Sequence, residues 1–159
     1  MRAGEFVRRL VRIPAAIAAL TMAASMASAN DPMVGSWLTD QRDGIVQIRP
    51  CGSQICGYVQ AILAVPEPGR KLLDNRNEKP ALRLRPLCGL PILGKLQKLA
   101  ANTWGNGWIY DPKTGKTWDV ELTLAKHDVL SVRGYYGVKT LGQTVIWTRA
   151  RPNSPKCKS

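Results

Sequence analysis

Residues 117–124 alternate without a break between polar and apolar side chains, in the order Thr-Trp-Asp-Val-Glu-Leu-Thr-Leu. Successive side chains of an extended strand point to opposite faces, so this period of two gathers the apolar groups on one face. The segment follows a turn sequence at 111–116, Asp-Pro-Lys-Thr-Gly-Lys, in which Pro presets φ and Gly supplies a positive φ. We therefore predict a half-buried β-strand that leaves a tight turn.

Similar short apolar segments, separated by turns rich in Gly, Pro and Asp, occur through most of the chain and predict an all-β domain. The predicted strands cover 34–39, 44–49, 57–63, 108–110, 117–124, 129–136 and 144–149. Seven or eight antiparallel strands can close into a small up-and-down barrel, which removes the exposed edges. Such a barrel is either filled by side chains or holds one small ligand. A β-sandwich fits the same pattern.

The alternation also predicts which side chains face the interior. They are Val46, Ile48, Val59, Ala61, Leu63, Leu130, Val132, Tyr136, Val145, Trp147 and Arg149, besides the apolar members of 117–124. Between residues 64 and 102 this rhythm breaks, and prolines there exclude a continuous helix. Residues 64–86 are predicted as a long loop, which in a small barrel commonly covers the mouth. Residues 87–101 are predicted as a strand or a short helical turn, because the apolar residues at 92, 93, 96 and 99 have helical spacing.

The first 29 residues have the composition of a cleavable signal peptide. Four arginines precede an apolar, Ala-rich stretch at 13–26, which is too short to span a bilayer as a mature helix. Ala27-Ser28-Ala29 provides the small residues that signal peptidase requires. We expect cleavage after Ala29 and export to the periplasm or the medium. Residues 30–159 then form the mature domain.

The mature segment is basic, with 19 Lys+Arg (23 − 4) and 10 Asp+Glu (11 − 1), a net charge of +9. Such a charge suits an acidic envelope component, for example anionic lipid or an acidic protein. The basic residues are scattered, so solubility is the simpler interpretation of the charge. Their scatter also argues against a nucleic-acid partner.

All four cysteines belong to the mature segment. In an oxidising compartment an even number predicts one or two disulfides, and four cysteines allow three connectivities. We favour Cys51–Cys56, because the four residues between them can turn a hairpin, with Cys88–Cys157 joining the tail to the body. Zinc binding is disfavoured, because the Cys-x4-Cys spacing has no second close pair or nearby His.

Several short motifs resemble the exported bacterial family known as domain of unknown function 2147. They occur in the same order at 35–37 (Gly-Ser-Trp), 56–57 (Cys-Gly), 85–90 (Arg-Pro-Leu-Cys-Gly-Leu), 110–116, 133–135 (Arg-Gly-Tyr) and 147–149 (Trp-Thr-Arg). The resemblance covers the chain from Val34 to Arg149. It implies a lipocalin-like closed barrel with an interior pocket, and it implies no agreed activity.

Lipocalin-like barrels place an Arg from a late strand over the Trp of a first-strand Gly-x-Trp. Here Gly35, Trp37 and Arg149 supply these parts, and we expect them to close the bottom of the barrel. A guanidinium stacked on an indole is worth about 0.5–2 kcal/mol. Arg133 is the alternative partner of Trp37.

No catalytic site is expected. His127 is the only histidine and lies in a polar turn beside Lys126 and Asp128, where solvation is the simpler interpretation. The sequence contains no metal-binding His-Glu-x-x-His and no glycine-rich nucleotide motif. We therefore expect neither a cofactor nor a metal site.

The long loop carries the best candidates for binding. Arg76, Arg83 and Arg85 could hold a carboxylate or phosphate if the loop covers the barrel mouth. Alternatively, the loop is solvated and Arg85 only maintains its shape. The aromatic candidates for lining a ligand cavity are Trp108, Tyr110 and Trp118.

The leading functional hypothesis is an exported, non-enzymatic barrel that binds a small amphipathic or acidic molecule in its cavity. The alternative is a filled barrel that acts as an interaction or inhibitor module on an envelope component. Cavity volume separates the two, because a barrel packed solid leaves no room for a ligand.

Overall fold

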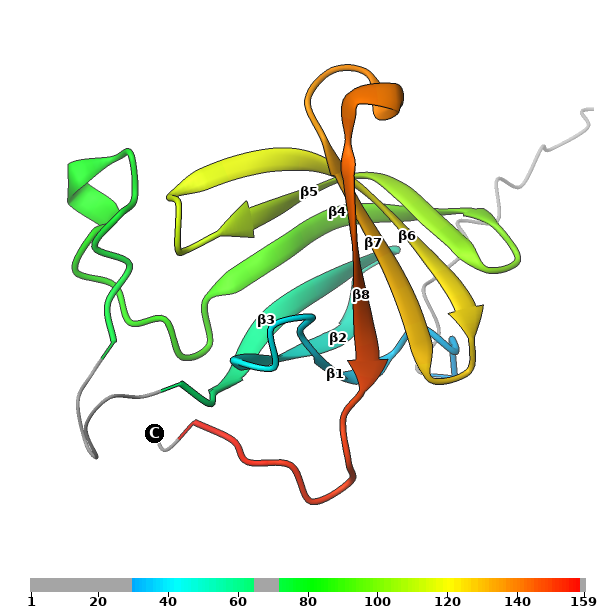
Figure 1. Cartoon of the computed structure of the whole chain (residues 1–159), viewed down its shortest axis with the longest axis horizontal. Coiled ribbons are helices and arrows are strands. Elements are labelled where there is room, and N and C mark those ends of the chain that lie inside the picture. The colour runs from blue at the N-terminus through cyan, green and yellow to red at the C-terminus, as the bar shows by residue number, and fades with distance from the viewer. Residues whose placement is uncertain (1–29, 65–71, 158–159) are drawn as a thin grey trace, which may run out of the picture.

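Each strand pairs antiparallel with the strand that precedes it, and the last strand returns to pair with the first. The result is a closed barrel, seen in the computed structural model of residues 30–64 and 72–157 (Figure 1). Its strands are β1 Gly35–Leu38, β2 Gly44–Cys51, β3 Gln54–Ile62, β4 Pro91–Ala100, β5 Thr103–Asp111, β6 Lys116–Lys126, β7 Val129–Tyr135 and β8 Gln143–Arg149. Two 3-10 turns accompany them, η1 Pro80–Leu82 and η2 Lys139–Leu141.

This topology confirms the predicted all-β up-and-down barrel and excludes the sandwich. The predicted signal peptide at 1–29 and part of the predicted long loop, 65–71, lie outside the described residues. None of the helical segments in the described part of the chain has the length and hydrophobicity needed to span a membrane.

The segment at 87–101 forms strand β4 from Pro91, so the helical alternative was wrong. The helical spacing had a different cause. Leu93 and Leu96 are both fully buried although they are three residues apart, because Lys95 adopts a positive φ of 58° between them. Leu96 pairs with Ile55 and Leu93 with Gly57, so β4 contains one more residue than β3 over this stretch. This bulge turns both leucines inward.

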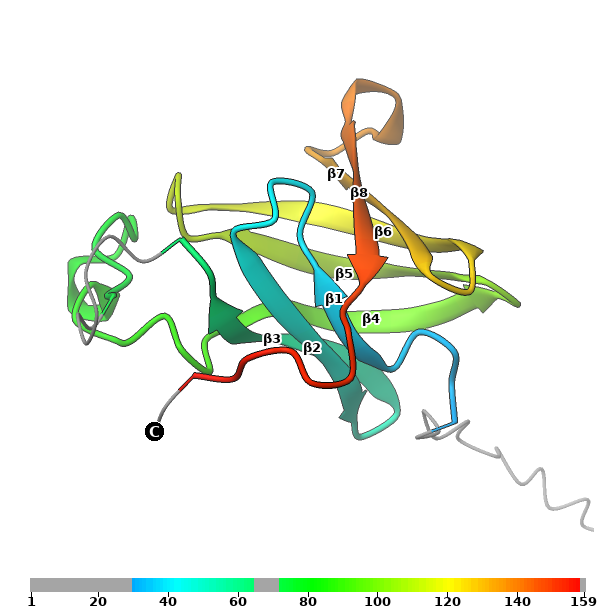
Figure 2. The same ribbon diagram turned by 60° about the horizontal axis from the view of Figure 1, so that its bottom comes forward.

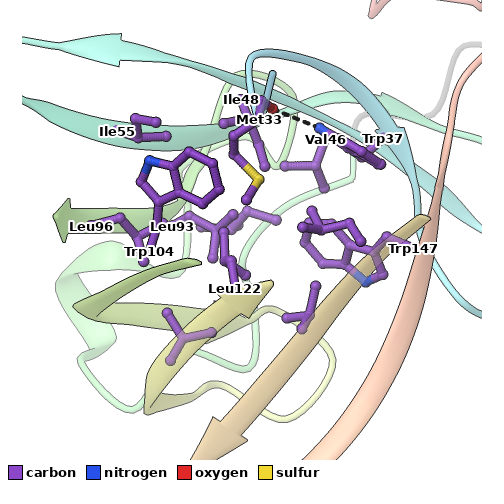
Figure 3. Close-up of a cluster of buried hydrophobic side chains, with 14 of the residues drawn as sticks. Met33, Trp37, Val46, Ile48, Ile55, Leu93, Leu96, Trp104, Leu122 and Trp147 are labelled. Atoms are coloured by element: carbon purple, nitrogen blue, oxygen red, sulfur yellow. Dashed lines mark hydrogen bonds between the residues drawn. The ribbon is translucent and has the colours of Figure 1, made fainter. Parts of the chain in front are cut away.

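One end of the barrel is packed solid. Its side chains come from the N-terminal segment and from most of the strands, and they include the indoles of Trp37, Trp104 and Trp147 (Figure 3). The largest fully buried side chains are Met33, Trp37, Ile48, Ile55, Leu93, Leu96, Trp104, Leu122 and Leu130. Most of the predicted interior positions are confirmed as buried. Tyr136 is an exception, because β7 ends at Tyr135 and the Tyr136 side chain is exposed. Leu63 is exposed for the same reason, since it follows the end of β3.

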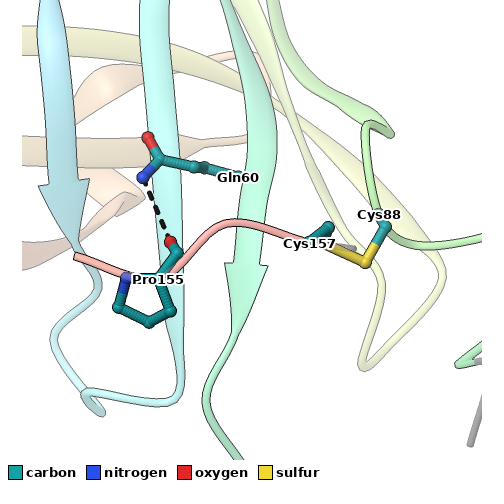
Figure 4. The surroundings of a disulfide bond; sticks show 4 residues. All are labelled: Gln60, Cys88, Pro155 and Cys157. Carbon is teal, nitrogen blue, oxygen red and sulfur yellow. Dashed lines mark hydrogen bonds between the residues drawn. A yellow bond between two sulfur atoms is a disulfide. The ribbon is translucent and has the colours of Figure 1, made fainter. Parts of the chain in front are cut away.

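Two disulfides join the cysteines as the sequence predicted. Cys51–Cys56 closes the β2–β3 hairpin, and Cys88–Cys157 joins the tail to the segment before β4 (Figure 4). The tail runs past β3, as the view in Figure 2 also shows. There the Cys157 amide donates to the Gln60 carbonyl at 2.7 Å, and the Gln60 side-chain amide donates to the Pro155 carbonyl at 3.2 Å.

We predict that the Cys88→Ser/Cys157→Ser variant loses more stability than the Cys51→Ser/Cys56→Ser variant. The two bonds span sequence separations of 69 and 5 residues, so chain entropy assigns them about 4 and about 2 kcal/mol. Urea denaturation of both double variants tests this ranking. Equal losses would show that loop length does not set the contribution of these bonds.

Candidate functional site

The open end of the barrel is formed by alternate connections. In an up-and-down barrel the β1–β2, β3–β4, β5–β6 and β7–β8 connections lie at the same end. A cavity of about 840 Å³ opens between them. The interior is therefore packed at one end and hollow at the other.

Apolar side chains form the wall of this cavity. They come from strands all around the barrel: Val46, Val59, Ala61, Ile92, Ile109, Val132, Val145 and Trp147. The polar lining belongs to the rim: Thr39, Asp40, Gln41, Asp43, Asp111, Lys113, Thr114 and Gln143. An apolar chamber with a polar rim accommodates a molecule that has an apolar body and a polar end.

The charges of the rim are largely compensated. Lys113 forms an ion pair with Asp43, and its ammonium also donates to the Gln41 carboxamide oxygen at 2.5 Å. Burial alone would raise the pKa of Asp43, but hydrogen bonds from Lys113 and Thr39 lower it below the ordinary value of 3.8. Lys113 is the only basic residue among the described cavity lining. The described rim therefore offers no unpaired cation.

The closed end has the predicted stack. The Arg149 guanidinium carbon lies 4.1 Å from the centre of a Trp37 ring, and the two residues are paired between β1 and β8. Arg149 also donates to the carbonyls of Pro32 at 2.7 Å and Val34 at 3.1 Å. Gly35, at φ 138°, leaves room for this guanidinium, since a Cβ there would lie 2.6 Å from Nη1. Burial lowers the pKa of Arg149 below its ordinary value. These contacts close the barrel.

Arg133, the alternative partner of Trp37, has a different role. Its guanidinium donates to the Lys139 carbonyl at 2.6 and 3.0 Å and to the Thr144 hydroxyl at 2.9 Å. Arg133 therefore holds the β7–β8 connection at the open end, far along the strand from the Trp37 stack. The alternative assignment was wrong.

A buried polar cluster attaches the long loop to the barrel. Asp74 is fully buried, and its carboxylate accepts hydrogen bonds from the Tyr110 hydroxyl at 2.5 Å and the Asn77 amide at 2.8 Å. The Arg85 Nε donates to the same carboxylate at 2.8 Å. Both oxygens of this buried carboxylate therefore accept hydrogen bonds, and Arg85 compensates its charge, as burial requires. Burial and the bond to Asp74 raise the pKa of Tyr110 above 10.0.

The three loop arginines maintain the loop rather than line the cavity. Arg85 binds Asp74, Arg83 donates to the Asn77 carbonyl at 2.8 Å, and Arg76 donates to the Lys113 carbonyl at 2.6 Å. None of them belongs to the cavity lining. Each of them binds a group of the loop or its support, so the structure does not bring them to the predicted ligand position.

Two of the three predicted aromatic candidates line the cavity, and the third does not. Tyr110 and Trp118 line the cavity. Trp108 does not; its indole packs against Gly94 of the neighbouring strand, where a Cβ would approach the ring to 2.5 Å.

Sequence reasoning missed the rim residues of the β1–β2 turn and of the β7–β8 connection. The alternation of strand direction was the available signal, because it places both connections at the end where 111–116 turns.

We predict that Arg149→Met destabilises the protein by about 2–4 kcal/mol, since it removes the stack and the charged hydrogen bonds to carbonyls of the N-terminal segment. Arg49→Met is the matched control. Arg49 also covers a ring, that of Tyr58 at 4.1 Å, but it lies on the exposed surface, so we expect a loss below about 1 kcal/mol. Chemical denaturation measures both. Similar small losses would contradict the closing role of Arg149.

We predict that Tyr110→Phe lowers stability by about 1–3 kcal/mol near neutral pH, because the buried Asp74 carboxylate loses a donor. The raised pKa of Tyr110 means that the fold favours the neutral phenol. This contribution is complete below pH 10 and is lost as the pH rises through the folded-state pKa. The stability difference between the wild type and the variant should therefore shrink above about pH 10. A stability difference that stays constant up to about pH 11 would refute this role of the Tyr110 hydroxyl.

The comparisons with known proteins agree with this architecture. Protein HP1028 from the human pathogen Helicobacter pylori, described as belonging to the lipocalin family, superimposes with a TM-score of 0.66 at 21% identity. The match covers 75% of this chain and 83% of that one. No curated protein matches the sequence. The profile of domain of unknown function 2147, an uncharacterized protein conserved in bacteria, matches residues 35–149. The chain therefore belongs to that bacterial family, with a lipocalin-like barrel.

Proposed function

We propose that this protein binds a small amphipathic molecule, with the apolar part in the barrel cavity and the polar end at the rim. One observation carries the proposal: an apolar chamber of about 840 Å³ that opens at one end of the barrel. Small-molecule sites in proteins have volumes of about 300–1,000 Å³ and mostly apolar walls. The lipocalin-like fold supports small-ligand binding at this place in the barrel.

Among the predicted ligands, the geometry favours an amphipathic molecule over an acidic one. An acidic group needs a free cation or a cluster of amide donors. Lys113 is already paired with Asp43, and Arg76, Arg83 and Arg85 bind groups of the loop and its support. We therefore assign the polar end of the ligand an uncharged or weakly polar group.

The cavity supports a hollow barrel over the filled barrel of the alternative hypothesis. Val132 and Val145, which are paired on the neighbouring strands β7 and β8, both line this cavity. A binding role without catalysis is part of the proposal. His127, in the β6–β7 turn at the closed end, has a side chain that is 82% exposed and interacts with Asp128 at 2.6 Å.

We further propose that binding takes place outside the cytoplasm, in the periplasm or the medium. The basic and apolar composition of residues 1–29 supports export, with cleavage after Ala29. Two disulfides support an oxidising compartment, in which such bonds persist.

Val145→Trp and Ile146→Trp test the cavity as a matched pair on β8. Val145 lines the cavity, whereas the neighbouring Ile146 is 47% exposed on the other face of the strand. With the fluorescent apolar probe N-phenyl-1-naphthylamine, Val145→Trp should weaken binding about tenfold or more, because an indole occupies the chamber. Ile146→Trp should bind like the wild type.

Two results would overturn the proposal. One is equal probe binding by both variants, which would place the probe outside the cavity. The other is a wild-type protein that binds neither the probe nor any lipid in native mass spectrometry after extraction from its compartment. Thermal melts of the variants separate loss of binding from loss of folding.

A further inference from the structure

The β7–β8 connection presents apolar side chains to solvent at its far end. Tyr136 is 80% exposed, Val138 54% and Leu141 81%. Residues 136–142, which we call the β7–β8 tip, project beyond the other strands in both views (Figures 1 and 2). Single exposed apolar residues are ordinary on protein surfaces, whereas three on one short projecting turn require an explanation.

Polar contacts at its base hold the tip in this position. Arg133 binds the Lys139 carbonyl, and the Gly137 amide donates to an Asp119 carboxylate oxygen at 3.3 Å. Gly142 packs so closely that a Cβ there would lie 2.6 Å from the Gly134 carbonyl oxygen. These contacts therefore fix the position of the tip. Its apolar side chains cannot turn inward unless the contacts break.

The exposed surface of the tip is continuous with the cavity. Tyr136 and Leu141 belong to the rim of the chamber as well as to the tip. Trp118, which is 37% exposed, adds an aromatic group to the same rim. An apolar molecule that leaves the chamber along this side can therefore contact Trp118, Tyr136 and Leu141.

The small size of the apolar surface on the tip and the balance of the charges around it indicate which kind of partner binds there. A stable protein interface takes about 20–30 residues a side, so three side chains are too few for a protein partner or for a stable dimer. A bilayer surface needs only a few apolar groups, and Tyr is suited to the boundary between headgroups and hydrocarbon. The nearby charges balance, because Glu121 pairs with Lys139 while Asp119 and Arg133 bind groups of the tip. The contact therefore depends on insertion more than on charge.

We propose that the β7–β8 tip inserts into the surface of a lipid bilayer and holds the mouth of the cavity against the membrane. The contact itself stands apart from the cavity, but its purpose, exchange of an amphipathic ligand with the bilayer, rests on the proposed function. The membrane then supplies both the docking surface and the ligand.

Flotation with vesicles tests the insertion. The probe is phosphatidylcholine vesicles, with and without phosphatidylglycerol. The protein is the chain from Asn30 onward, which contains all strands of the described barrel and both disulfides. We expect binding to both compositions and little effect of salt. The triple variant Tyr136→Ser/Val138→Ser/Leu141→Ser should bind about a hundredfold more weakly. The control Ile146→Ser, at another exposed apolar position, should bind like the wild type.

Each other outcome overturns the proposal. Equal binding by the triple variant and the wild type would place the membrane contact elsewhere. Binding only to phosphatidylglycerol vesicles, lost in salt, would show a charge contact. A wild-type dimer that the triple variant abolishes would make the tip a protein interface. Binding of N-phenyl-1-naphthylamine without vesicles, measured on the same variants, reports separately whether the cavity works.

Discussion

The seam between β1 and β8 closes the barrel, and it is the weakest part of the ring. The two strands share only the registered pairs Trp37–Arg149 and Leu38–Thr148, whereas β2 and β3 pair along their whole length. Side-chain contacts compensate for the short run of backbone pairing between β1 and β8. Arg149 covers Trp37 and binds carbonyls of the N-terminal segment, and the Trp37 indole donates to the Met33 carbonyl at 2.9 Å. Without this seam the sheet would have two open edges and the cavity no continuous wall.

The same closure explains why the two ends of the barrel differ. Large side chains and the N-terminal segment fill the end where Arg149 lies, so the ring is held there by packing. The open end can remain hollow, because side-chain hydrogen bonds, and not packing in the interior, hold its loops in place. Asp74 ties the long loop to Tyr110, and Arg133 holds the β7–β8 tip. A rigid apolar chamber beside a projecting apolar tip is the arrangement from which the proposed exchange with a bilayer follows.

Much of this architecture was predictable from local patterns. Period-two alternation located most strands and their inward side chains, and the Gly-x-Trp motif with a late Arg identified the closing stack. The errors have physical causes. The bulge at Lys95 gave a strand the spacing of a helix, because it turns Leu93 and Leu96 to one face. The loop arginines were assigned to a ligand because the sequence does not show that they bind Asp74 and nearby carbonyls.

By itself the sequence determined the class of fold and the faces of most strands. It favoured the pairing of two cysteines within a hairpin, and its resemblance to lipocalin-like barrels indicated the residues that close the barrel. These follow from interactions between near neighbours in the chain or from a motif with one geometry. Only the tertiary structure decided that the barrel is hollow, that Tyr110 and Trp118 line it while Trp108 does not, and that Tyr136 and Leu141 stand exposed at its mouth. A cavity is the space that side chains from distant strands fail to fill, and no local pattern records how far each of them reaches across the barrel.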